Sequence, residues 1–157
     1  MDKLSYNSAF VVDRMLGGLA KWLRITGFDA LYNNKYTREQ LINISRQTNR
    51  IILTRDTWFE ANKDVSSIVL HDNYTIGQLK ELFKKYNLFI DPNRFFTRCV
   101  VCNSELIKVG KNEVKNFVPS FVLSTQDTFS KCPSCKRIYW GGTHKENMLQ
   151  TLKVIFL

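Results

Sequence analysis

The sequence predicts a two-part protein: an open, mostly parallel α/β sheet with helices on both faces, followed by a small β-rich region. Over residues 9–88, short apolar runs alternate with amphipathic segments of helical period, which is the order expected of a parallel sheet. Beyond residue 94, only short β-like segments follow, spaced between two C-x-x-C pairs. The run "DPNRFF" at 91–96 precedes this change, and its proline blocks continuation of a helix. We therefore expect one domain over residues 1–94 and a second over residues 95–157.

The first domain is expected to repeat a strand–helix unit four times. Its strand candidates are the apolar runs 9–12, 28–33, 51–54 and 66–71. Apolar residues recur at helical spacing over residues 14–27, and Gly27 stands where a helix C-terminal glycine belongs. Gly17 and Gly18 weaken this helix, so we expect packing to compensate or the backbone to approach another group closely there.

The remaining helices of the first domain are placed by capping signals. Thr37 with Gln40 and Thr75 with Gln78 both match a capping-box pattern, and a short helix is expected after Asp56. In the second domain, the expected short β segments are residues 105–110, 117–123 and 137–140.

All four cysteines of the chain lie in the two C-x-x-C pairs, Cys99 with Cys102 and Cys132 with Cys135, separated by 29 residues. Each pair lets two thiolates converge on one ion, so the pattern favours a tetrahedral zinc site. Four thiolates complete the coordination shell, so we expect a structural zinc that stabilises the second domain and activates no water. An iron–sulfur cluster is chemically possible with the same ligands. Disulfides require an oxidising compartment, for which the sequence carries no signal.

The charge of the chain favours an anionic partner. The formal net charge is +9, and no basic amphipathic helix with a strong apolar face suggests a membrane surface, so nucleic acid is the expected partner. No apolar run approaches the roughly 18 residues that cross a bilayer. Residues 1–15 contain no apolar segment of the secretory type, so we expect a cytoplasmic protein.

Two aspartates follow predicted strands. Asp13 comes directly after the run 9–12, and Asp56 comes two residues after the run 51–54. Ligands of open parallel sheets bind beyond the carboxyl ends of the strands, and Mg²⁺ takes one or two protein carboxylates. An ion held there can activate a water for attack on phosphorus. Because aspartate is also a preferred N-cap residue, capping of the following helix is the alternative role for both acids.

Three segments of the chain resemble the Mut-seven C-terminal RNase domain family. They are "FVVDRMLGGLAKWLRITGFDALY", "RIILTRD" and "CPSCKRIYWGGTH", which occur in the family's order and span nearly the whole chain. The resemblance implies a PIN-like nuclease fold joined to a C-terminal zinc ribbon, with Asp13 and Asp56 as metal-binding acids and the four cysteines as zinc ligands. Family members usually carry an acid at the start of the helix after the second strand. Here Arg38 stands at that position, and Glu39 is the nearest acid.

The leading hypothesis is a PIN-like, metal-dependent ribonuclease acting on single-stranded or structured RNA. In it, Asp13 and Asp56 hold Mg²⁺ or Mn²⁺ and Glu39 assists. The basic side chains expected to contact phosphates are Arg14, Lys21, Arg24, Arg55 and Arg98. The alternative is a non-catalytic RNA-binding or complex-assembly module on the same scaffold, because only two well-placed acids are evident. A DNA-binding zinc-ribbon protein is a third possibility, but no distinctive recognition helix supports it.

Overall fold

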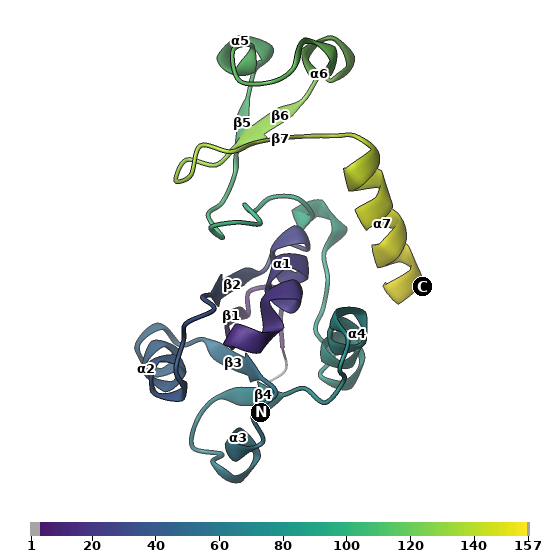
Figure 1. The fold of residues 1–157 in the computed structure, drawn as a ribbon. Helices are drawn as coiled ribbons and strands as arrows, with labels where there is room; N and C mark the ends of the chain where they lie inside the picture. Colours follow the sequence, from purple (N-terminus) through teal and green to yellow (C-terminus); the bar gives the residue numbers. More distant parts are fainter. Residues whose placement is uncertain (1–3, 157) are drawn as a thin grey trace. The chain divides into compact units, whose positions relative to one another are not determined.

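The computed structural model describes residues 4–156, which separate into two compact units, one ending at Asn103 and one beginning at Ser104. The first unit has the predicted alternation of strands and helices (Figure 1). Its elements are β1 (Ala9–Val12), η1 (Arg14–Leu16), α1 (Gly17–Ile25), β2 (Asp29–Tyr32), α2 (Arg38–Thr48), β3 (Ile51–Thr54), α3 (Trp58–Ala61), β4 (Ser67–Val69), α4 (Thr75–Lys85) and η2 (Pro92–Arg94). The predicted domains 1–94 and 95–157 stay a prediction, because compactness does not show which segments fold separately.

The four strands of the first unit form one parallel sheet in the order β2-β1-β3-β4. The two central strands are β1 and β3, whose register places Val11 beside Ile52 and Val12 beside Leu53. All four of these side chains are fully buried, as expected for central strands of a sheet covered on both sides. The predicted mixed α/β class with a parallel sheet is therefore confirmed.

Helices cover both faces of this sheet. On one face, α2 and α3 contribute to a buried cluster made of Val11, Leu41, Ile52, Phe59, Val65 and Val69. Phe10 precedes Val11 in β1 and so points to the opposite face. There its ring lies 5.9 Å from that of Phe28, which in turn lies 6.1 Å from Phe83 of α4. Helix α1 packs against both β2 and α4.

The two glycines at the start of α1 allow a close approach of neighbouring side chains, as expected. A Cβ atom on Gly17 would lie 2.7 Å from the hydroxyl oxygen of Tyr32, and one on Gly18 would lie 2.6 Å from the hydroxyl oxygen of Thr75. Gly27 follows α1 with a φ of +91°, a conformation that L side chains rarely adopt. The predicted helix end is therefore confirmed.

One of the two predicted capping boxes is present. Thr37 and Gln40 exchange the expected hydrogen bonds at the start of α2, with N···O distances of 2.9 and 3.2 Å. The prediction for Thr75 and Gln78 is wrong, because α4 begins at Thr75 itself and its N-terminus has no side-chain cap. The hydroxyl of Thr75 instead lies against the backbone of Gly18, a tertiary contact that the capping pattern does not register.

The second unit contains an antiparallel sheet in the order β5-β6-β7. Its elements are β5 (Ile107–Val109), α5 (Lys111–Val114), α6 (Ser120–Thr125), β6 (Phe129–Lys131), β7 (Ile138–Trp140) and α7 (Thr143–Phe156). The β segment predicted over 117–123 is wrong, because α6 begins within it. Pro119 is the residue before this helix, and its fixed φ, here −59°, suits a helix start.

Over residues 4–156, no helix is both long and apolar enough to cross a bilayer.

Candidate active site and cysteine cluster

Asp13 and Asp56 lie at the same edge of the parallel sheet. Asp13 directly follows β1, and its amide donates to the carbonyl of Leu53 in β3 at 2.9 Å. Asp56 follows β3 by two residues. Because β1 and β3 are adjacent and parallel, the two acids stand beyond neighbouring carboxyl ends, where open α/β sheets bind ligands.

A threonine hydroxyl joins the two acids. The Oγ1 of Thr54, the last residue of β3, donates to Oδ2 of Asp13 at 2.6 Å and accepts the amide N–H of Asp56 at 2.9 Å. Thr54 is fully buried, and Asp13 is only 8% exposed. The sequence analysis missed Thr54, because a threonine at the end of an apolar strand looks like an ordinary core residue.

Both acids also accept hydrogen bonds from the backbone that follows them. Asp13 Oδ1 accepts the N–H of Arg14 at 2.7 Å, and Asp56 Oδ1 accepts the N–H of Trp58 at 3.0 Å. The alternative role in capping is therefore present for Asp13, which is the N-cap residue of η1, whereas the N-cap residue of α3 is Thr57 rather than Asp56. An ionised carboxylate has about four lone-pair positions, so these bonds leave each acid room for a further ligand.

Arg38, the first residue of α2, forms an ion pair with Asp56. Its Nε and Nη2 both donate to Oδ2 of Asp56, at 2.8 and 2.6 Å, and its guanidinium carbon lies 4.7 Å from the centre of the Trp58 ring. Burial by itself would raise the pKa of Asp56. The hydrogen bonds from Trp58 N–H and from Arg38, with the charge of Arg38, outweigh that effect and lower the pKa. Asp56 is therefore ionised at neutral pH.

The third predicted acid, Glu39, is exposed in the first turn of α2, next to Arg38. Within residues 4–156, the only group of three or more histidine, cysteine or acidic side chains placed to share an ion is the four cysteines. Asp13, Asp56 and Glu39 are therefore not brought together as a three-acid cluster. Two carboxylates still fit one hard divalent ion, because Mg²⁺ keeps several waters and takes only one or two protein carboxylates.

The five predicted phosphate contacts divide into two groups. Arg14 and Lys21, at the start of and within the first helical segment, are exposed. Arg55 is half-buried next to Asp56, and its Nη2 donates to Oδ1 of Asn73 at 2.6 Å. Arg14 adjoins Asp13 and Arg55 adjoins Asp56, so both lie near the sheet edge that carries the acids, whereas Lys21 is an exposed residue of α1.

Arg24 is instead buried, with 5% of its surface exposed. Its Nε donates to the carbonyl of Ala30 at 2.9 Å, and its Nη1 donates to the carbonyls of Val100 and Val101 at 3.0 and 3.1 Å. Burial lowers the pKa of Arg24, although nearby thiol and acidic groups oppose the shift. The guanidinium thus holds the turn between Cys99 and Cys102 against β2 rather than facing solvent.

Arg98 and Asn103 secure the same turn from its two ends. Arg98 donates to the carbonyls of Gly27 and Asn103, at 3.3 and 2.9 Å. The side-chain nitrogen of Asn103 donates to Oδ1 of Asp29 at 2.6 Å, and its side-chain oxygen accepts the N–H of Ala30 at 3.0 Å. We therefore leave Arg24 and Arg98 out of the phosphate contacts that we propose below.

The two C-x-x-C pairs have the same local backbone geometry. The residue after each pair, Asn103 or Lys136, has a positive φ, of 70° or 65°. Its N–H donates to the carbonyl of the first cysteine of its pair, at 2.9 Å for Cys99 and 3.0 Å for Cys132. In the second pair, the N–H of Cys135 also donates to Sγ of Cys132 at 3.4 Å. Such turns bring both sulfurs of a pair to the same side of the chain.

The four sulfur atoms of Cys99, Cys102, Cys132 and Cys135 lie within 4.8 Å of one another. No disulfide joins them. Zinc–sulfur bonds of about 2.3 Å in a tetrahedron place sulfurs about 3.8 Å apart, so the cluster has the ligands and the dimensions for one zinc ion. This cluster can bind a metal such as zinc, as the spacing predicted.

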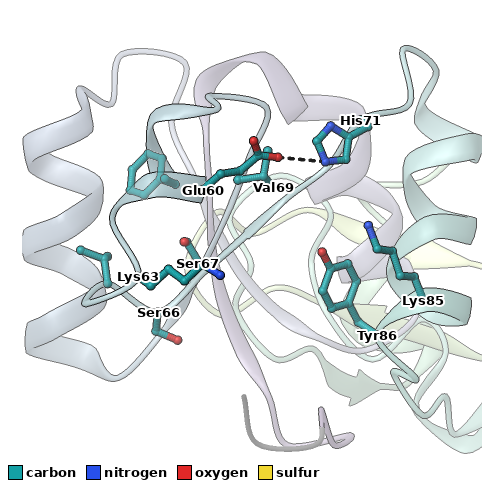
Figure 2. A pocket seen from close by; sticks show the side chains of 10 residues that line it. Glu60, Lys63, Ser66, Ser67, Val69, His71, Lys85 and Tyr86 are labelled. Atoms are coloured by element: carbon teal, nitrogen blue, oxygen red, sulfur yellow. Dashed lines mark ion pairs between the residues drawn. The ribbon is translucent and has the colours of Figure 1, made fainter.

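A separate cavity of about 540 Å³ lies where α3, β4 and α4 meet (Figure 2). Glu60 and His71 face each other across its rim with 3.1 Å between Oε1 and Nε2. Lys85, the last residue of α4, and Tyr86 also line the cavity. None of the predicted catalytic acids lines this cavity, so it is not the candidate active site.

Comparison with known proteins agrees with the resemblance seen in the sequence. The family model of the Mut7-C RNAse domain matches residues 8–152. The human protein "Exonuclease mut-7 homolog" is 30% identical over an alignment of 115 residues that covers 69% of this chain and 13% of that protein. The chain thus corresponds to a small part of this relative. Because the family model covers nearly all of the sequence, both acids and all four cysteines included, the chain belongs to the Mut7-C RNase domain family.

Proposed function

We propose that this chain is a PIN-like, divalent-metal-dependent ribonuclease domain that hydrolyses RNA phosphodiesters. The observation that carries the proposal is the pair Asp13 and Asp56, held at the carboxyl ends of the two central strands by the shared hydroxyl of Thr54. The family to which the chain belongs supports RNA as the substrate.

In this proposal, Asp13 and Asp56 hold one Mg²⁺ or Mn²⁺ ion. Such an ion, when bound, supplies an activated water and neutralises charge on the phosphoryl oxygens. Thr54 fixes the Asp13 carboxylate, and the buried position of Asp13 keeps bulk water away from one side of it. Arg14, Lys21 and Arg55 contact backbone phosphates, and Glu39 gives weaker assistance from the first turn of α2.

A second candidate function is a non-catalytic RNA-binding or complex-assembly module on the same scaffold. The ion pair between Arg38 and Asp56 favours this candidate, because it partly neutralises one of the two acids. The experiment below separates the two functions.

For residues 95–157 we propose a structural zinc ribbon that aids RNA binding. Phe117 and Phe121 are 72% and 75% exposed, and Nζ of Lys131 lies 5.9 Å from the centre of the Phe117 ring. An exposed aromatic ring beside a cation suits a stacked base and its phosphate. Phe117→Ala should therefore weaken binding of single-stranded RNA about tenfold, since base stacking contributes about 1–3 kcal/mol. The matched control is Val154→Ala, which shortens another exposed apolar residue (76%) and should leave affinity unchanged.

The decisive experiment is Mn²⁺-dependent cleavage of a labelled single-stranded RNA by wild type and Asp13→Asn. Loss of a metal ligand removes several kcal/mol of transition-state stabilisation, so we expect a rate at least about 100-fold lower for the variant. RNA affinity should be unchanged or tighter, because a negative charge near the phosphates is gone.

Asp64→Asn is the matched control, because Asp64 is exposed and forms only a surface ion pair with Arg46. It should cleave like wild type. If wild type cleaves no RNA with Mg²⁺ or Mn²⁺ and Asp13→Asn binds RNA like wild type, the nuclease is rejected in favour of the binding module.

A further inference from the structure

Arg38 forms an ion pair with Asp56, one of the two acids of the candidate active site. Its guanidinium contacts the carboxylate of Asp56 and the ring of Trp58, yet 47% of its side chain is exposed. The Asp56 side chain is 29% exposed and the Trp58 residue 37%. The three side chains thus form one solvent-accessible unit beside the buried Asp13.

The hydrogen bonds show which positions of the carboxylates remain open. Both donors of Arg38 use Oδ2 of Asp56, which has two lone pairs, so this oxygen is fully occupied. Oδ1 of Asp56 already accepts one bond from Trp58 N–H. On Asp13, each oxygen accepts one bond, from Arg14 N–H and from Thr54. A divalent cation can therefore bind an open lone pair on each of the two acids. Both lone pairs of Oδ2 of Asp56, however, accept hydrogen bonds from the positively charged Arg38.

We propose that Arg38 is an internal counter-ion that competes with the divalent cation for Asp56 and moves to a phosphate of bound RNA. This inference rests on the proposed function, because it assigns Asp13 and Asp56 as the metal-binding acids. A guanidinium binds phosphate oxygens as well as it binds carboxylates, and it does so through the same pair of parallel donors. A backbone phosphate that approaches the acids therefore offers Arg38 an alternative partner.

The consequence is that metal binding and RNA binding strengthen each other. When Arg38 leaves Asp56 for a phosphate, the carboxylate regains its full charge and its second oxygen. By thermodynamic linkage, RNA must then raise the affinity for the metal by the same factor as the metal raises the affinity for RNA. The RNA-free protein binds the divalent ion weakly, and the site is completed only when substrate is present.

The first test measures Mn²⁺ binding to the RNA-free protein at low ionic strength, by the loss of the free Mn²⁺ electron paramagnetic resonance signal. Arg38→Gln should bind Mn²⁺ about tenfold to a hundredfold more tightly than wild type, because a repelling charge a few ångströms from the ion is removed. Arg38→Lys, which keeps the charge, should stay closer to wild type. Arg38→Gln combined with Asp56→Asn should lose the gain.

Arg46→Gln is the matched control. Arg46 lies on the same helix and pairs with the exposed Asp64 at 3.3 Å, away from the two acids. It should bind Mn²⁺ like wild type. Arginine and glutamine have similar helix propensity, and exposed ion pairs contribute little stability, so both glutamine variants should remain folded.

The second test adds a phosphorothioate oligonucleotide, which carries the backbone charge of RNA and resists cleavage. It should tighten Mn²⁺ binding to wild type about tenfold and to Arg38→Gln much less. Equal Mn²⁺ affinity of wild type and Arg38→Gln, or no detectable Mn²⁺ binding by any variant, would overturn the proposal. If the Mn²⁺ affinities follow the prediction but no RNA is cleaved, the counter-ion role of Arg38 stands and the nuclease activity fails. If RNA is cleaved but Arg38→Gln leaves Mn²⁺ affinity unchanged, the nuclease activity stands and the counter-ion role of Arg38 fails.

Discussion

Replacing Thr54 by valine tests whether its hydroxyl holds the candidate active site together. Valine has nearly the same shape as threonine, so the change removes the hydroxyl with little effect on volume. Two hydrogen bonds are lost, one to the Asp13 carboxylate at 2.6 Å and one from the Asp56 amide at 2.9 Å. A bond to a charged group contributes about 1.5–3 kcal/mol and a neutral one about 0.5–1.5 kcal/mol. Because Thr54 is fully buried, water cannot replace its hydroxyl directly. We expect Thr54→Val to lower the free energy of unfolding by about 2–4 kcal/mol.

The matched control is Thr54→Ser, which keeps the hydroxyl and removes one buried methyl group. It should cost about 1 kcal/mol. Urea unfolding at pH 7 measures both free energies, and hydrogen exchange of the β1 and β3 amides shows whether the loss falls on the first unit. Wild type should also bind Mn²⁺ more tightly than Thr54→Val, because Asp13 is no longer oriented in the variant. If valine costs no more than serine, the hydroxyl does not hold the two acids and the reasoning fails.

Two further predictions concern the cysteines and the acid sensitivity of the fold. Protein purified under reducing conditions should contain about one zinc per chain, and stoichiometric iron would contradict this. Cys135→Ser, which changes the most exposed of the four ligands, should lose most of the zinc and show faster hydrogen exchange in β5–β7. Burial alone would raise the pKa of Asp29, but hydrogen bonds from Arg50 and Asn103 and nearby positive charge lower it. Its stabilising contribution is therefore present above the unfolded-state pKa of about 3.9 and is lost as pH falls through the lower folded-state value. Unfolding free energy should thus fall less steeply between about pH 5 and pH 3 in Asp29→Asn than in wild type, and parallel pH profiles would contradict this.

The features that the sequence alone predicted are local in origin. The strands 9–12 and 51–54 are short apolar runs, each followed directly by a charged residue, and they lie where they were predicted. The end of α1 just before Gly27 and the start of α2 just after Thr37 follow from backbone preferences and capping bonds within a few residues. The four cysteines were predicted as one metal-binding group because a C-x-x-C turn brings two sulfurs together within four residues.

The wrong predictions have two physical causes, which are competition from tertiary contacts and a helix start that was overlooked. Thr75 matches a capping pattern, but its hydroxyl packs on α1. The segment 117–123 has the apolar residues of a strand, but Pro119 favours the start of α6. Arg24 looks like any surface arginine at helical spacing, yet its guanidinium is used by carbonyls 6, 76 and 77 residues away.

The sequence could also place acids after strands, but it could not say what surrounds them. The contact of Thr54 with Asp13 joins residues 41 apart and depends on β1 lying beside β3 in one particular register. The ion pair of Arg38 with Asp56 joins residues 18 apart and depends on how α2 packs over that sheet edge. Strand order, register and helix packing arise from the burial of apolar faces across the whole unit, which no short motif encodes. The sequence therefore determined which acids follow the two central strands, and only the tertiary structure decided that a hydroxyl links these acids and that an arginine pairs with one of them.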